Sequence, residues 1–145
     1  MKVAFDVHGV LDTHEEYRAM MRFMHNFGYE IYIISGQPLD EEMRALLNEH
    51  TLTEWYHYYF SVETYLLESG DETYEERPEG KFWPDASWDG VKARICEAHY
   101  IDMIFDNSPA YAATFKDIDT HFNLVIDKEM FNAEKLKGRL NIHRR

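Results

Sequence analysis

The chain has 145 residues, a length that predicts one domain. Hydrophobic residues make up 45% of it, which excludes an intrinsically disordered protein, and no apolar run approaches the roughly 20 residues of a membrane helix. The net charge of -12 repels phosphate backbones, so bulk nucleic acid is not an expected partner. Cys96 is the single cysteine, so no internal disulfide can form, as is usual in a reducing compartment. We therefore expect a soluble, cytoplasmic protein with no membrane partner.

The N-terminal residues predict a strand followed by a helix. A short apolar run with β-branched and aromatic residues covers residues 2–7 and predicts the strand. Thr13 and Glu16 then have the spacing of a capping box, which predicts that the helix begins at Thr13. Gly28 is expected to end it. The residues expected on its inward face are Tyr17, Met20, Met24 and Phe27.

A second unit of strand, helix and strand follows. The run EIYII predicts a strand over residues 30–34, and the apolar spacing of residues 40–49 predicts a helix. The aromatic run over residues 55–62 predicts another strand, with one buried side and one solvent-exposed edge.

Residues 68–80 form an acidic segment, with six acidic residues and one Arg. This composition predicts a solvated loop or a hairpin, in which residues 74–76 pair with residues 81–83. The loop after the first strand is too short to hold a cap domain. A small hairpin or loop insert at about residues 63–88 is therefore the only expected lid. Aromatic residues expected there either to contact a substrate or to pack onto the sheet are Phe82, Trp83 and Trp88.

The remaining residues continue the alternation of helices and strands. A helix is expected to begin at Ser87 or Asp89, followed by strands over residues 101–105 and 121–126 and a basic tail at residues 139–145. The residues expected to face inward from this helix are Val91, Ile95 and Ala98. Alternating strands and helices with short connections predict the α/β class, with a Rossmann-like parallel sheet flanked by helices.

Polar residues directly follow three of the predicted strands. Asp6 follows the first strand, Ser35 and Gly36 follow the second, and Asp106 and Asn107 follow the strand at 101–105. In parallel sheets ligands bind beyond the carboxyl ends of the strands, so these residues are the candidates for a site. Two converging carboxylates suit Mg²⁺, and a carboxylate at a strand end can also attack phosphorus.

The motifs resemble those of the haloacid dehalogenase-like superfamily. KVAFDVHGVLDT is similar to its first motif, YIISG to its second and IDMIFDNSP to its fourth, in the family's order. Lys92, in SWDGVKARI, has the place of the third-motif lysine, with Lys81 as the alternative. The resemblance covers about residues 2–126 and implies one such domain over residues 1–145 with a minimal cap. The activity it implies is a Mg²⁺-dependent phosphatase acting on a small phosphorylated metabolite or nucleotide.

The resemblance also implies a role for each matching residue. Asp6 would be the nucleophile, with Mg²⁺ held by Asp6, by the backbone carbonyl of His8 and by Asp106. Ser35 would bind the phosphoryl group and Lys92 would neutralise its charge. The further residues expected at the substrate are Gly9, Gly36 and Asn107.

Two residues depart from the family pattern. His8 occupies the position of the usual second Asp, which protonates the leaving group and later activates water. Imidazole can carry protons near neutral pH, so we expect His8 to take the catalytic role. Asn107 stands where many members have a second acid. Two alternatives stay open: a catalytically degenerate protein that binds phosphate or a partner, and a metal-dependent nuclease, which the negative net charge disfavours.

Overall fold

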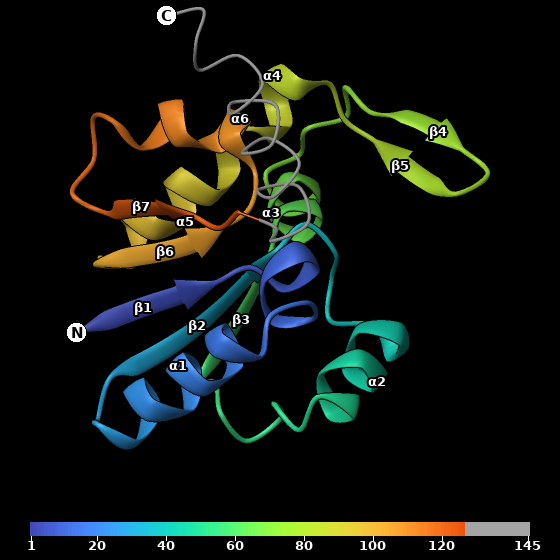
Figure 1. Cartoon of the computed structure of the whole chain (residues 1–145). Coiled ribbons are helices and arrows are strands. Elements are labelled where there is room, and N and C mark those ends of the chain that lie inside the picture. Colours follow the sequence, from blue (N-terminus) through green and yellow to red (C-terminus); the bar gives the residue numbers. More distant parts are fainter. Residues whose placement is uncertain (127–145) are drawn as a thin grey trace, which may run out of the picture.

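The computed structural model describes residues 1–126, and a five-stranded parallel sheet forms its centre (Figure 1). The strands lie in the order β3-β2-β1-β6-β7, and every neighbouring pair is parallel. They are β1 (Lys2–Phe5), β2 (Glu30–Ser35), β3 (Tyr58–Ser61), β6 (Met103–Asp106) and β7 (His121–Leu124). The predicted α/β, Rossmann-like class is confirmed. The predicted basic tail lies outside the described residues.

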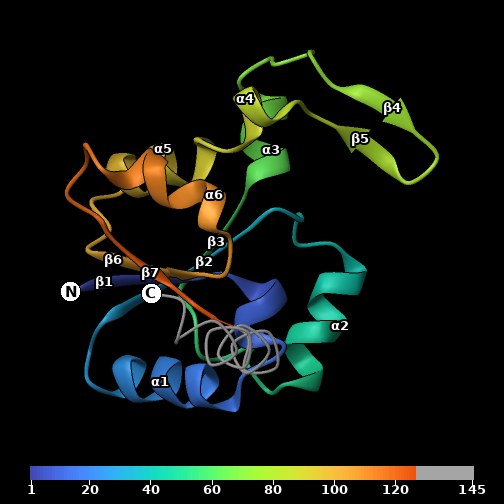
Figure 2. The same cartoon turned by 45° about the horizontal axis from the view of Figure 1, so that its top comes forward.

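Helices cover both faces of the sheet (Figures 1 and 2). The helical segments are η1 (Val7–Leu11), α1 (Glu15–Asn26), α2 (Glu41–Glu49), α3 (Val62–Glu68), α4 (Asp85–Trp88), α5 (Val91–Ala98), α6 (Pro109–Ala112) and η2 (Ala113–Phe115). Side chains alternate between the faces of a strand. Val3 and Phe5 therefore join the core under α1 and α2, while Ala4 joins the core under α3 and α5. Within residues 1–126, no helix has the length and apolarity needed to cross a membrane.

The order of the strands brings three strand ends to one place. From β1 the chain moves outward through β2 to β3, and β6 then returns to the other side of β1. Phe5, at the end of β1, is opposite Ile33 of β2 and Phe105 of β6. A reversal of strand order of this kind is where α/β sheets bind ligands. The residues at the carboxyl ends of β1, β2 and β6 therefore lie where a ligand is expected.

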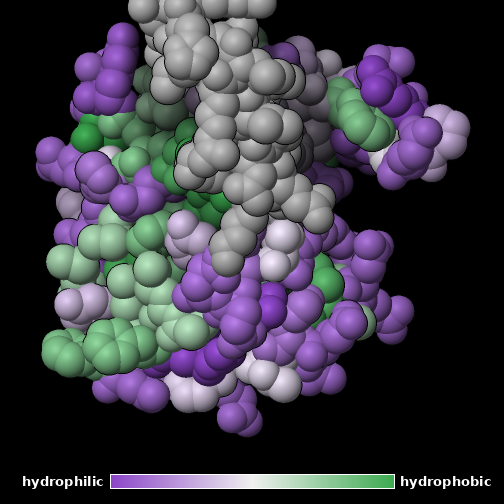
Figure 3. All heavy atoms as spheres, viewed as in Figure 1, coloured by the Kyte–Doolittle hydropathy of each residue, from purple (hydrophilic) through white to green (hydrophobic). Residues whose placement is uncertain are grey.

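A segment of mixed structure connects β3 to α5. It contains α3, the antiparallel hairpin β4 (Glu75–Arg77) and β5 (Gly80–Phe82), and α4. The predicted hairpin therefore forms, with its strands about one residue from their expected bounds. It projects outward from the body instead of lying across the sheet, and its visible surface is largely hydrophilic (Figures 1 and 3). Trp83, directly after it, is buried in the core, so the hairpin is anchored at its base.

Hydrogen bonds around η1 explain two wrong predictions near the N-terminus. The first strand is shorter than expected because the chain turns at Asp6, whose carboxylate accepts a 2.9 Å bond from Val7 N–H. The predicted capping box does not form. Helix α1 begins at Glu15, and the Thr13 hydroxyl donates to Asp12 over 2.7 Å instead of capping the helix.

The strand predicted over residues 55–62 is shorter, and a helix was missed after it. Ser61 ends β3 and caps α3, because its hydroxyl oxygen accepts a 2.9 Å bond from Thr64 N–H. The single helix predicted to begin near residue 87 is two helices, α4 and α5, interrupted at Gly90.

Two predicted inward positions are exposed. Phe27 is 69% exposed, since it follows the last residue of α1 and stacks on Phe23 at the surface. Ala98, the last residue of α5, is also exposed. Both lie at helix ends, where the helical spacing no longer decides which face is covered.

Candidate active site

Asp6 is the first residue after β1 and is buried at the carboxyl end of the sheet. Its backbone N–H donates to Phe105 O over 2.9 Å, which continues the pairing with β6. Its side chain accepts from Val7 N–H and begins the turn of η1. An Asp at this position satisfies a free backbone donor, and the adjacent strands fix its direction.

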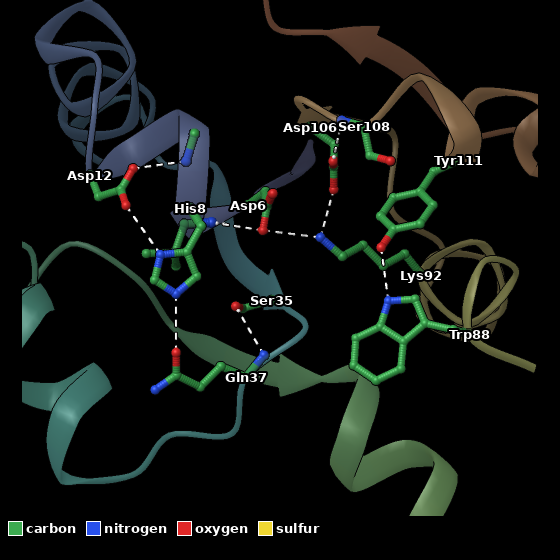
Figure 4. A network of polar contacts seen from close by, with 12 residues as sticks. Asp6, His8, Asp12, Ser35, Gln37, Trp88, Lys92, Asp106, Ser108 and Tyr111 are labelled. Carbon is green, nitrogen blue, oxygen red and sulfur yellow. Dashed lines mark hydrogen bonds and ion pairs between the residues drawn. The ribbon is translucent and has the colours of Figure 1, made fainter. Parts of the chain in front are cut away.

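Lys92 links Asp6 to Asp106 (Figure 4). The lysine extends from α5, is buried, and places Nζ 3.0 Å from Asp6 Oδ1 and 2.6 Å from Asp106 Oδ2. Asp106 is fully buried, and its Oδ1 accepts from Ser108 N–H over 2.9 Å. The structure thus brings together three of the residues that the sequence predicted, from β1, α5 and β6.

The charges of this cluster do not balance. With both carboxylates ionised, two negative charges face one ammonium, which leaves a formal charge of −1. Burial raises the pKa of Asp6, and the charge of Lys92 offsets only part of that rise. Burial alone would lower the pKa of Lys92, but the charges of Asp6 and Asp106 outweigh it and raise that pKa. A further cation would therefore stabilise the ionised form of Asp6.

The second oxygen of Asp6 lies in a position suited to such a cation. The Asn107 amide nitrogen can donate to Asp6 Oδ2 and to the backbone oxygen of His8, each over 3.2 Å. A half-turn of the amide would place its oxygen there, so that the amide oxygen would face both the Asp6 carboxylate and the His8 carbonyl. These are the hard donors that Mg²⁺ takes, together with water molecules. The residues present therefore fit Mg²⁺.

Asn107 is better placed than Asp106 to provide the third oxygen ligand of the cation, although the sequence predicted Asp106. Both oxygens of Asp106 are engaged, by Lys92 and by the N–H of Ser108. Within residues 1–126, no three His, Cys, Asp or Glu side chains are grouped as metal ligands. The candidate cation site consequently depends on one carboxylate with a carbonyl and an amide.

The His8 ring points away from Asp6, toward Asp12 and Gln37 (Figure 4). Nδ1 lies 3.1 Å from Asp12 Oδ2, and Nε2 lies 3.0 Å from Gln37 Oε1. Partial burial lowers the pKa of His8, but the bonds to Gln37 and Asp12 outweigh it and raise the pKa above its usual value. Beside the ring is a hollow of ≈ 310 Å³, lined also by Asp12, Gln37 and Glu42.

Gly9 is required by the geometry of the turn and does not offer a free donor. Its φ is +84°, and a Cβ there would approach the Asn107 side chain to 2.0 Å. Its N–H already donates to Asp12 Oδ1 over 2.8 Å. The Gly9 N–H is therefore engaged within the turn, and the contact of Gly9 with a substrate stays a prediction.

Ser35 and Gly36 lie at the end of β2, on the same edge of the sheet. Ser35 is fully buried, and its hydroxyl oxygen is 3.3 Å from the Gln37 N–H that donates to it. Gly36 lies against the indole of Trp88, to which a Cβ would come within 2.9 Å. Both residues lie at the site, but the contacts that the structure gives them belong to the turn after β2: Ser35 accepts from Gln37 N–H, and Gly36 leaves room for Trp88.

Sequence reasoning gave no site role to Asp12, Gln37 and Tyr111, which complete the network. Asp12 and Gln37 orient the His8 ring, and Tyr111 accepts a 2.8 Å bond from Trp88 Nε1. Asp12 lies four residues after His8, which is the one spacing in the sequence that could have suggested a pair. Gln37 and Tyr111 reach the site only through tertiary packing.

No protein-family model matches the chain, and no curated protein matches it. The fold is similar to a crystal structure of an uncharacterized protein from Corynebacterium glutamicum ATCC 13032 Kitasato, with a TM-score of 0.53. The two sequences are 14% identical, over 94% of this chain and 92% of that one. This likeness bears on the fold alone, so any function must be inferred from the site itself.

Proposed function

We propose that the protein is a Mg²⁺-dependent phosphatase of the haloacid dehalogenase-like type, with Asp6 as the nucleophile. The observation that carries this proposal is the surroundings of the Asp6 carboxylate. One oxygen is bound by Lys92, while the other faces the Asn107 amide, which also faces the backbone oxygen of His8. A small phosphorylated metabolite or nucleotide is the proposed substrate.

The first step transfers the phosphoryl group to Asp6. A carboxylate oxygen of Asp6 attacks phosphorus, the bond from phosphorus to the leaving oxygen breaks, and an aspartyl-phosphate forms. Lys92 offsets the charge on the phosphoryl oxygens. Bound Mg²⁺, held by Asp6, the His8 carbonyl and Asn107, would supply further charge neutralisation.

His8 is the proposed carrier of the proton. Its Nε2 is bonded to Gln37 Oε1 in this structure, and once the ring turns toward Asp6 the oxygen of a leaving group could replace that amide as its partner. The leaving oxygen takes the proton from His8, and the neutral ring then accepts one from the water that attacks phosphorus. That second attack releases phosphate and restores the Asp6 carboxylate.

One observation favours a second candidate, a phosphate binder without turnover. The His8 ring is 54% exposed and is bonded to Asp12 and Gln37, so it must turn to serve Asp6. If the ring cannot turn, the protein would still bind phosphate, but His8 would not transfer a proton to the leaving group.

Hydrolysis of p-nitrophenyl phosphate and of a panel of phosphorylated metabolites and nucleotides tests the proposal. Wild-type protein and Asp6→Asn would be assayed with Mg²⁺ and with a chelator, after circular dichroism shows that both are folded. We expect turnover only in wild-type protein with Mg²⁺. Equal turnover by Asp6→Asn would contradict the proposal. Binding of Mg²⁺ and phosphate without turnover would favour the second candidate.

A further inference from the structure

The Lys92 ammonium has a third neighbour besides the two carboxylates. Its Nζ lies 5.4 Å from the centre of the Tyr111 ring, on α6. An ammonium carries three N–H donors, and two of them face Asp6 and Asp106. An aromatic face attracts a cation at this distance, most strongly where water is excluded. Lys92 is therefore enclosed by two carboxylates and one ring.

Trp88 holds the Tyr111 ring in this position. The indole N–H donates to the Tyr111 hydroxyl over 2.8 Å. The same indole lies against Gly36, so it packs between the end of β2 and α6. The absence of a Cβ at residue 36 is what allows this approach.

Trp88 is also the link between the site and the segment that carries the hairpin. It is the last residue of α4, and its ring centre lies 6.1 Å from that of Trp83, which lies 5.1 Å from Tyr74. The rings thus form a continuous aromatic path from the base of the hairpin to Lys92. The exposed hairpin strands lie beyond that path.

We propose that Trp88 and Tyr111 are positioning residues that keep the Lys92 ammonium dry and directed at Asp6 and Asp106. This proposal rests on the proposed function and assigns a role to the segment between β3 and α5. That segment supports the lysine through α4 instead of closing over the site as a lid. A lysine side chain has four flexible carbons. The Tyr111 ring, on the side of the ammonium that the carboxylates do not cover, therefore restricts the positions that the charge can take.

Kinetics of Tyr111 variants test the proposal in the full-length protein. Tyr111→Leu removes the ring, Tyr111→Phe keeps it, and Tyr58→Leu is the matched control on β3, where Tyr58 is 49% exposed and packs on Tyr32. From the strength of a desolvated cation–π contact, we expect Tyr111→Leu to lower kcat by about 5- to 30-fold with KM changed less than about twofold. Tyr111→Phe should retain most of kcat, and Tyr58→Leu all of it.

Nitrogen-detected NMR of the Lys92 ammonium provides a readout that does not need activity. We expect slow exchange with water in wild-type protein and Tyr111→Phe, and fast exchange in Tyr111→Leu. If wild-type protein hydrolyses nothing, the proposed function fails while this readout still tests the lysine's surroundings. Should Tyr111→Leu not fold, Trp88→Leu provides the test instead, because it removes the indole ring that lies between Gly36 and Tyr111, and exchange is expected to accelerate. Unchanged exchange in the folded variant, or equal kcat losses in Tyr111→Leu and Tyr111→Phe, would overturn the proposal.

Discussion

In the proposed mechanism His8 has two roles, one for its backbone oxygen and one for its ring. Its backbone oxygen faces the Asn107 side chain at the candidate cation position. A residue of any type could provide this backbone oxygen. Its ring is bonded to Asp12 and Gln37, and these bonds raise its pKa despite partial burial. A raised pKa means that more of the ring is protonated near neutral pH, as a proton donor requires.

Replacing His8 by Ala separates these functions. The carbonyl is retained and the proton carrier is lost, so we expect about 10²–10⁴-fold slower hydrolysis of alkyl phosphates. The loss should be smaller for p-nitrophenyl phosphate, because p-nitrophenolate leaves without a proton. Steady-state kinetics on both substrates measure the difference. Equal, small losses on the two would mean that the ring carries no proton in catalysis.

Cys96 allows a test of how completely water is excluded from the core beside the site. Burial raises the pKa of its thiol to about 12, with a smaller opposing effect from Lys92. In the unfolded chain a thiol ionises near pH 8.5, so the unfolded state loses its proton first as pH rises. The stability contributed by the neutral buried thiol is therefore lost between about pH 8.5 and 12.

Urea unfolding at two pH values measures this loss. Between about pH 7.5 and 9.5, wild-type protein should lose about 1 kcal/mol more unfolding free energy than Cys96→Ala. The variant provides the reference because other groups also titrate in this range. Identical pH slopes for the two proteins would mean that the thiol is accessible to water.

At the scale of elements, the sequence predicted the central strands and the longer helices but not their ends. Short apolar runs rich in β-branched and aromatic residues, such as EIYII, are typical of a buried parallel strand. Ends depend instead on single hydrogen bonds. Thr13 and Ser61 both precede a helix, yet only the Ser61 hydroxyl accepts from its helix. Periodicity contains no information on which of the two will do so.

This difference predicts unequal effects of removing the two hydroxyls. Ser61→Ala should lower the unfolding free energy by about 1 kcal/mol, since it leaves an N–H of α3 uncapped. Thr13→Ala should change it by less than about 0.5 kcal/mol, as is usual for an exposed position. Chemical denaturation of both variants measures the two values. A larger effect at Thr13 would indicate that the capping box forms in solution.

At the scale of the whole molecule, parallel pairing determines where the site lies. Asp6 is far in sequence from Lys92 and Asp106. The pairing of β1 with β6 places Asp6 near Asp106, and α5, which precedes β6, brings the Lys92 ammonium within hydrogen-bonding distance of both. The sequence could predict this convergence because Asp6 and Asp106 each follow an apolar strand. It could not predict the cover formed by Trp88 and Tyr111, because these residues meet only after α4 and α6 have packed. The position of the Asn107 side chain was not predictable either, because it lies against the turn at Gly9, where a Cβ would approach it to 2.0 Å.

The proposed mechanism requires that a phosphoryl group pass through Asp6, and acid quenching detects that intermediate. Wild-type protein and His8→Ala would be mixed with substrate and Mg²⁺, quenched in acid within milliseconds to seconds, digested and examined by mass spectrometry. We predict that the peptide containing Asp6 gains one phosphoryl group on Asp6, and that the adduct persists longer in His8→Ala because the attacking water lacks its base. Turnover with an unmodified Asp6 at every time point, in both proteins, would contradict a mechanism through an aspartyl-phosphate.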